Sequence, residues 1–157
     1  RMSMRPFGIQ AIGSTIFVTY AKTQPKSGDE VDKGHFGYVD AYDAATGMFI
    51  TRVASRGPLD APWGIAMAPQ GFGDLGGDLL IGNFGDGMIN AYMPVLGGLS
   101  YVALGPLTGA DGSPLLIDGL WALQFGNGGG AGPTGTLFFT AGPNDENDGL
   151  FGSITPG

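Results

Sequence analysis

Cysteine is absent from this chain of 157 residues. A disulfide framework, a thiolate zinc site and a cysteine nucleophile are therefore all excluded. Charge is also scarce, since only 13% of the residues are charged and acidic residues outnumber basic ones by 14 to 7. A net charge of −7 argues against binding to nucleic acid or to an anionic membrane surface, because both need a basic footprint.

Long apolar runs and helical periodicity are missing as well. The longest apolar runs have the length of a strand, so no membrane-spanning helix is expected. Glycine, by contrast, accounts for 31 residues and lies mainly between short apolar runs, where tight turns need it. This combination is typical of an all-β protein with many short strands.

Three internal repeats organise the chain. Pro6–Ile9 aligns with Pro62–Ile65, and Trp63 aligns with Trp121, so each repeat opens with an aromatic residue on a short apolar strand. A second strand follows at 16–20, 79–83 and 137–141, and a third at 38–42, 88–92 and 150–154. A fourth strand is found only twice, at 49–53 and 101–104.

Four strands per repeat predict a β-propeller of three blades, each a four-stranded antiparallel sheet. The blades span about 6–56, 62–106 and 119–157, and the last lacks its outer strand. A simple β-sandwich is the alternative, but it does not explain the recurrence. Three blades cannot close a ring, so we expect a partner. It is either a second copy of the chain or a missing N-terminal half, giving six blades.

Two segments carry a family resemblance: residues 62–69 with 77–92, and the tail at 139–152. They resemble an uncharacterised bacterial family of NHL-like six-bladed propellers, often secreted and sometimes carrying a C-terminal sorting signal. The resemblance implies that this chain is the C-terminal half of such a protein, with an extracellular or periplasmic location. It implies no catalytic residues.

Acidic residues concentrate in loops that a propeller places on one face. The loops between second and third strands, with the connections between repeats, hold Asp29, Glu30, Asp32, Asp60, Asp86, Asp111, Asp118, Asp145, Glu146 and Asp148. Phe7, Trp63 and Trp121 begin the first strands and are expected around the same mouth, either stacking on a ligand or packing between blades.

Calcium is the cation that this face would suit, because it takes oxygen ligands. The candidate ligands are Asn83, Asp118, Asn144 and Asp145. A solvated polar turn is the favoured explanation of residues 144–148, since their spacing is not that of an EF-hand. The one histidine, His35, is expected to be an exposed loop residue, and no serine has the context of a catalytic triad.

The sequence therefore favours an extracellular, non-catalytic binding or scaffold module that presents an acidic loop face. Two alternatives stay open. One is a calcium-dependent hydrolase or lactonase of the gluconolactonase-like propeller type. The other is a structural subunit that assembles through its open blade edges.

Overall fold

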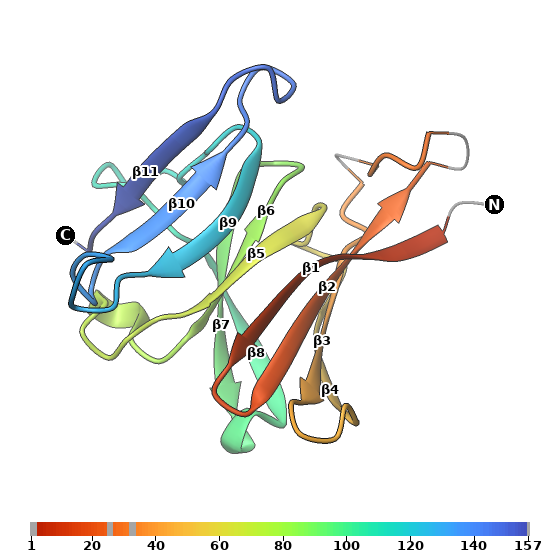
Figure 1. Ribbon diagram of the computed structural model, residues 1–157, viewed down its shortest axis with the longest axis horizontal. Coiled ribbons are helices and arrows are strands. Elements are labelled where there is room, and N and C mark those ends of the chain that lie inside the picture. Colours follow the sequence, from red (N-terminus) through yellow and green to blue (C-terminus); the bar gives the residue numbers. More distant parts are fainter. Residues whose placement is uncertain (1–2, 25–26, 32–33, 157) are drawn as a thin grey trace.

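The structure is a computed structural model that describes residues 3–24, 27–31 and 34–156. It is all-β, with eleven strands and two short 3₁₀ turns in the described residues (Figure 1). The strands are β1 (Ser3–Ile12), β2 (Thr15–Thr23), β3 (Tyr38–Asp43), β4 (Phe49–Ser55), β5 (Pro62–Met67), β6 (Leu79–Asn83), β7 (Ile89–Val95), β8 (Ser100–Pro106), β9 (Leu120–Phe125), β10 (Leu137–Ala141) and β11 (Leu150–Ile154). The turns are η1 (Gly73–Leu75) and η2 (Leu96–Gly98).

The strands form three antiparallel sheets in which chain neighbours pair. Sheet 1 has the order β1-β2-β3-β4, sheet 2 has β5-β6-β7-β8, and sheet 3 has β9-β10-β11. The all-β prediction is confirmed, as is the absence of a fourth strand from the third sheet among the described residues. One boundary was wrong, because β1 begins at Ser3 and pairs with β2 from there onward, rather than starting near Pro6.

Each first strand carries a β-bulge at the same place. Ile9 pairs with Val18, but the next registered pair is Pro6 with Tyr20, so two residues on β1 oppose one on β2. The same two-against-one pattern recurs between β5 and β6, opposite Gly82, and between β9 and β10, opposite Thr140. A bulge bends a strand and redirects a side chain. The bulged residues are the aromatic residue and its small successor in all three sheets.

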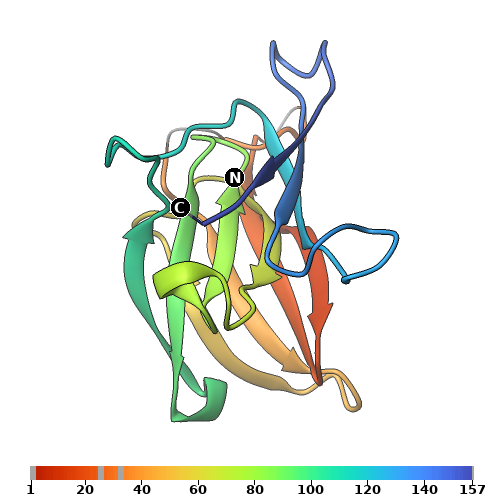
Figure 2. The same ribbon diagram turned by 90° about the vertical axis from the view of Figure 1, so that its left-hand side faces the viewer.

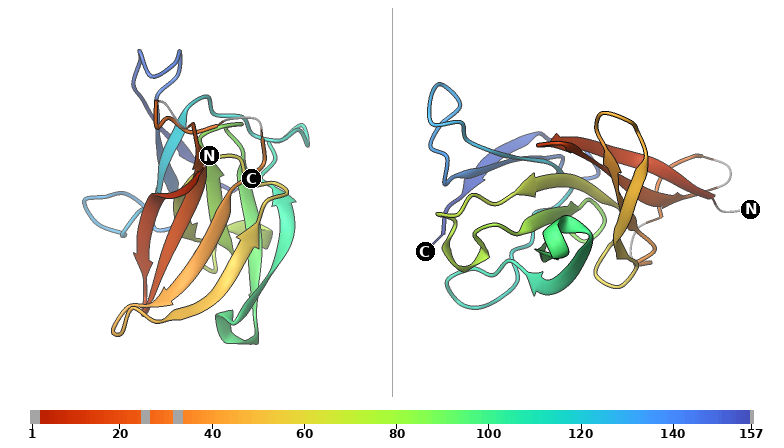
Figure 3. Two further views of the ribbon diagram at one scale, coloured as in Figure 1. Left: turned by 90° about the vertical axis from the view of Figure 1, so that its right-hand side faces the viewer. Right: turned by 90° about the horizontal axis from the view of Figure 1, so that it is seen from below.

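The bulges also set how closely successive sheets approach. A Cβ atom on Gly8 would lie 2.5 Å from the carbonyl oxygen of Trp63, and one on Gly64 would lie 2.5 Å from the carbonyl oxygen of Trp121. Glycine therefore permits the close approach at both junctions, since real Cβ atoms essentially never come so close to a carbonyl oxygen and a larger residue would force the strands apart. The same close contact thus recurs at both junctions, and sheet 2 lies between sheets 1 and 3 when the molecule is seen from below (Figure 3).

Two apolar clusters fill the spaces between the sheets. Between sheets 1 and 2 the buried cluster is Phe17, Val39, Ala41, Val53, Leu59, Ile65, Leu79, Ile81 and Tyr92. Between sheets 2 and 3 it is Ala66, Ala68, Phe72, Leu80, Ile89, Ala91, Leu107, Leu120, Leu123 and Leu137. Sheet 2 is thus buried on both faces, whereas sheets 1 and 3 each have one face toward solvent.

Candidate functional site

The predicted face corresponds to the end of the sheets at the top of Figure 1, which we call the upper end. The β2–β3, β6–β7 and β10–β11 loops lie there, together with the β4–β5 and β8–β9 connections. The β10–β11 loop projects farthest, as Figure 2 shows. Asp32 lies outside the described residues.

The three predicted aromatic residues split into two groups. Phe7 packs on Trp63 with ring centroids 4.7 Å apart, and its edge also meets Phe84 at 6.2 Å. These contacts join sheet 1 to sheet 2. Trp121 instead lies beside its own β10–β11 loop, where its indole N–H donates to Oε1 of Glu146 at 3.1 Å.

Asp118 and Asn144, two of the predicted metal ligands, are brought together. Oδ2 of Asp118 accepts a hydrogen bond from the backbone N–H of Asn144 at 3.1 Å, and the Asn144 side-chain amide donates to Oδ2 of Asp148 at 2.8 Å. Asp145 lies next in the chain and is exposed. Two hydrogen bonds, with Asp118 and with Trp121 at the start of β9, therefore hold the β10–β11 loop, while its acidic residues remain exposed.

The backbone of this loop has an unusual conformation. Asn144, Asp145 and Glu146 have φ values of 59°, 52° and 61°, three consecutive residues in the left-handed region. That region costs a non-glycine residue roughly 1–2 kcal/mol, although Asn and Asp tolerate it best. The hydrogen bond that Asp118 accepts from Asn144 and the one that Trp121 donates to Glu146 offset part of the cost.

Asn83, the remaining predicted ligand, makes different contacts. It is completely buried, and its amide donates to the carbonyl oxygen of Pro58 at 2.7 Å and to Oδ1 of Asp86 at 3.0 Å. Its own Oδ1 is buried and finds no hydrogen-bond partner among the described residues. Asn83 thus fastens sheet 2 to the β4–β5 connection, and it is not hydrogen-bonded to Asp118 or Asn144 in the described structure.

Asp60 stands two residues before β5, as Asp118 stands two residues before β9, but among the described residues its carboxylate bonds the β2–β3 loop of the preceding sheet and not a loop of its own sheet. It is buried, and its Oδ1 accepts backbone N–H groups from Gly34 and His35 at 3.2 and 3.4 Å. His35 itself is exposed. Within the described part of the chain, no group of three or more His, Cys, Asp or Glu side chains is arranged to hold a metal ion.

A charge asymmetry, readable from the sequence but missed in its interpretation, runs through the molecule. All seven lysine and arginine residues lie within residues 1–56, alongside five acidic residues. Residues 57–157 hold nine acidic residues and no lysine, arginine or histidine. Sheet 1 and its loops therefore carry a net positive charge of two, and the rest of the chain a net negative charge of nine.

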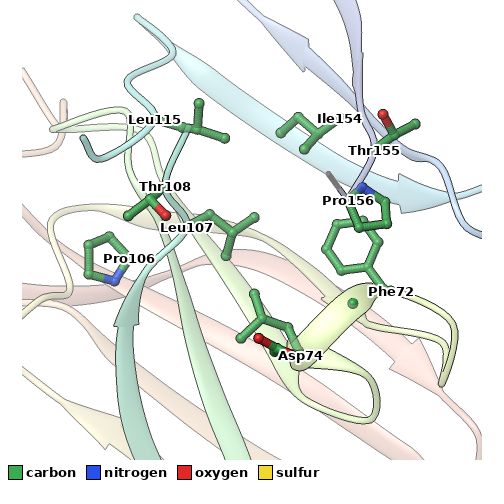
Figure 4. Close-up of a pocket in the computed structure, with 11 residues that line it drawn as sticks. Phe72, Asp74, Pro106, Leu107, Thr108, Leu115, Ile154, Thr155 and Pro156 are labelled. Atoms are coloured by element: carbon green, nitrogen blue, oxygen red, sulfur yellow. The ribbon is translucent and has the colours of Figure 1, made fainter. Parts of the chain in front are cut away.

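The hollow shown in Figure 4 lies away from the predicted residues. It has a volume of about 350 Å³ and opens between η1, the segment after β8 and the end of β11. Phe72, Leu107, Leu115 and Ile154 line it, and Asp74 is its one ionisable side chain. It lies beside the outer edge of β11, where sheet 3 lacks the fourth strand that sheets 1 and 2 have.

No helix in the described residues has the length and hydropathy to cross a membrane.

Comparison with known proteins finds viral relatives. An uncharacterized protein of Acanthamoeba polyphaga mimivirus is 36% identical over 158 residues, covering 98% of this chain and 36% of that protein. A second uncharacterized protein of the same virus is 33% identical over 154 residues, covering 95% of this chain and 37% of that protein. The chain therefore spans about a third of the length of the curated relatives it matches.

No protein-family model matches the chain. Among solved structures, Kuenenia stuttgartiensis hydrazine synthase shares 15% identity and a TM-score of 0.47, covering 96% of this chain and 46% of that one. The resemblance to a bacterial NHL-like family was wrong, because the relatives found are mimivirus proteins and no family model supports it. The extracellular or periplasmic location rested on that resemblance alone and stays a prediction.

Proposed function

We propose that the three sheets are consecutive blades of a β-propeller. Support comes from the shared meander order, the bulge at one position of every first strand, and the glycine-to-carbonyl contact at both junctions. A radial repeat is the architecture in which every sheet meets the next by the same step.

We further propose that the chain acts as a non-catalytic binding module through its upper end. The observation that carries this is the β10–β11 loop, whose exposed carboxylates are held in place by Asp118 and Trp121. They lie in a part of the chain with no lysine or arginine to neutralise them. The partner of matching chemistry is a basic protein segment, because the negative charge of the loop attracts it. A loop that is already held in place also binds with little loss of conformational entropy.

Titration with a lysine- and arginine-rich peptide at low ionic strength tests this proposal, with a glycine- and serine-rich peptide for comparison. Trp121 reports binding through its fluorescence, because its indole contacts the loop. Asp145→Asn is the informative variant, since this carboxylate is exposed and lies within the loop. Asp74→Asn is the matched control, because Asp74 is also exposed but lies at η1, away from the upper end.

We expect the basic peptide to bind and Asp145→Asn to weaken binding roughly fivefold, in line with about 1 kcal/mol for one exposed charge pair. Asp74→Asn should change it by less than twofold. Equal effects of the two substitutions would mean that net charge alone attracts the peptide. Saturable binding of calcium, titrated alone, that Asp145→Asn abolishes would instead support the calcium hypothesis.

A further inference from the structure

The solvent-facing side of sheet 1 carries apolar side chains around the Asp40–Arg52 ion pair. Ile9, Val18, Ile16 and Tyr42 lie on this side, which we call the first outer face. The strand registers give each of these residues an equivalent in sheets 2 and 3. Ile9 corresponds to Ile65 and Leu123, and Val18 corresponds to Ile81 and Phe139. Ile16 corresponds to Leu79 and Leu137, and Tyr42 corresponds to Tyr92 and Ile154.

In sheets 2 and 3 these positions are covered by the preceding sheet. Ile65 is 2% exposed and Leu123 is 2% exposed, whereas Ile9 is 71% exposed. The first outer face thus exposes Ile9 at a position that is buried in the other two sheets, next to the half-buried Ile16, Val18 and Tyr42. An exposed apolar patch of this kind marks an interaction site.

The solvent-facing side of sheet 3 also carries partly or largely exposed apolar side chains at positions that are buried in the other two sheets. Phe138, Thr140 and Phe151 lie on it, which we call the second outer face. Phe138 occupies the position of Phe17 and Leu80, and Phe151 that of Val39 and Ile89, all four of which are buried. The two phenyl rings stack 5.7 Å apart at an angle of 3°, yet Phe151 is 70% exposed.

Charge makes the two outer faces complementary. At the upper end of sheet 1, Lys22 lies over the ring of Phe36 at 3.5 Å, and Arg56 donates to the hydroxyl of Tyr38 at 3.1 Å. At the upper end of sheet 3, the β10–β11 loop holds Glu146 and Asp148. Both sets lie at the same end of the molecule, so stacking sheet 3 of one copy against sheet 1 of another brings them together (Figure 1).

We propose that the second outer face of one copy of this chain packs against the first outer face of another copy, head to tail. The contact continues the step by which sheets 1, 2 and 3 follow one another. When each of two copies uses both faces, the product is a closed dimer in which every sheet is covered on both sides. This inference goes beyond the binding function proposed above. It shares the β10–β11 loop with that function, but its apolar contacts come from Ile9, Phe138 and Phe151.

One departure from the repeat fixes how tight the contact between copies is. Ala122 stands where Gly8 and Gly64 stand in the first two repeats. A Cβ at the equivalent positions would be 2.5 Å from the next carbonyl oxygen, so the inner strands at the contact between copies must lie farther apart. Ala122→Gly should therefore strengthen the association, about tenfold if the closer approach is regained.

Sedimentation equilibrium of the chain tests the proposal. We expect twice the 16.1 kDa mass of one chain, with dissociation promoted by salt because the upper-end charges are exposed. Ile9→Asp and Phe151→Asp should each give a monomer, since each places a carboxylate in the contact. Both side chains are largely exposed in the single chain, so both variants should fold, as checked by circular dichroism. Leu96→Asp is the control, because Leu96 is 79% exposed at η2 and should leave the mass unchanged.

Mixing the two monomeric variants supplies a sharper test. Ile9→Asp keeps an intact second outer face and Phe151→Asp keeps an intact first outer face, so together they form one unaltered contact. A one-to-one complex should appear only in the mixture. A wild-type monomer, or no complex in the mixture, would overturn the proposal. Peptide binding by the upper end, measured on the monomeric variants, shows separately whether the proposed function holds.

Discussion

Replacing Gly64 with alanine probes the contact that sets the spacing between sheets 2 and 3. The new methyl group would lie 2.5 Å from the carbonyl oxygen of Trp121 and 2.9 Å from Cγ of Leu123. Ordinary van der Waals contact begins near 3.4 Å, so β5 and β9 must separate by about 1 Å, enough to lose up to half of the dispersion energy between the atoms that part. Overpacking of this size costs about 1–3 kcal/mol.

Part of that cost is offset in the unfolded chain. The φ of Gly64 is not in the left-handed region, so alanine can adopt it. Alanine also lowers the conformational entropy of the unfolded chain, which stabilises the folded state by about 0.4–1 kcal/mol. The net loss should be about 1–2 kcal/mol, or a fall in Tm of roughly 2–8 °C for a chain of this size. Urea unfolding followed by circular dichroism gives the free energy of unfolding, and a thermal scan gives the Tm.

Gly149→Ala is the matched control. A Cβ on Gly149 would meet no atom within 4 Å, and its φ is not positive. This substitution should leave stability unchanged or raise it by up to about 1 kcal/mol. If Gly64→Ala were as stable as Gly149→Ala, the close approach of β5 to β9 would be refuted, and with it the argument that equal junctions repeat along the chain.

Three further substitutions test single polar groups. Thr19→Val should cost about 1–2 kcal/mol in urea unfolding, because buried Oγ1 of Thr19 accepts the backbone N–H of Gly8 at 2.7 Å and its loss leaves that group unpaired. Thr140→Val, where the equivalent bond is exposed and 3.3 Å long, should cost less than about 0.5 kcal/mol, and equal losses would contradict the reasoning. Tyr92→Phe should stabilise the protein by about 1 kcal/mol at neutral pH, since the buried hydroxyl finds no partner among the described residues. Burial also raises the pKa of Tyr92 from 10.0 to about 12, so the folded state keeps a proton that the unfolded chain loses. The contribution of Tyr92 to the free energy of unfolding should therefore be constant below about pH 10 and fall by about 2 kcal/mol between pH 10 and 12, and Tyr92→Phe should remove that contribution to the pH dependence.

The repeat was predictable from sequence because its signals are local. An aromatic residue followed by a small one opens each first strand, and continuous apolar runs mark the second strands, so the three-sheet order follows without any long-range information. The start of β1 was missed because Ser3, Met4 and Arg5 carry no strand pattern of their own. They become strand through pairing with β2, at the registers Ser3 with Thr23 and Arg5 with Ala21.

The candidate site was predicted less completely. Asp118 and Asn144 are 26 positions apart, and a propeller was expected to place both at the same end of the sheets, which the structure does. The separate bonding of Asn83 was not predictable, because it depends on the carbonyl oxygen of Pro58 in the connection from the previous sheet. The three consecutive left-handed residues in the β10–β11 loop were also not predicted, because none of them is a glycine.

The departures from the repeat make sense when residues are compared in pairs across a junction. Gly82 replaces the threonine found at the same position in sheets 1 and 3 because the side chain of Leu120, from sheet 3, takes the space, with Cδ2 only 2.8 Å from where a Cβ would be. The size of a side chain on one sheet therefore depends on how closely the side chains of the neighbouring sheet approach it. By the same reasoning, Ala122 and Phe151 on the second outer face report a neighbour that stands farther away and leaves room for larger side chains. The size of side chains on that face thus predicts a looser contact between copies than either junction within one chain.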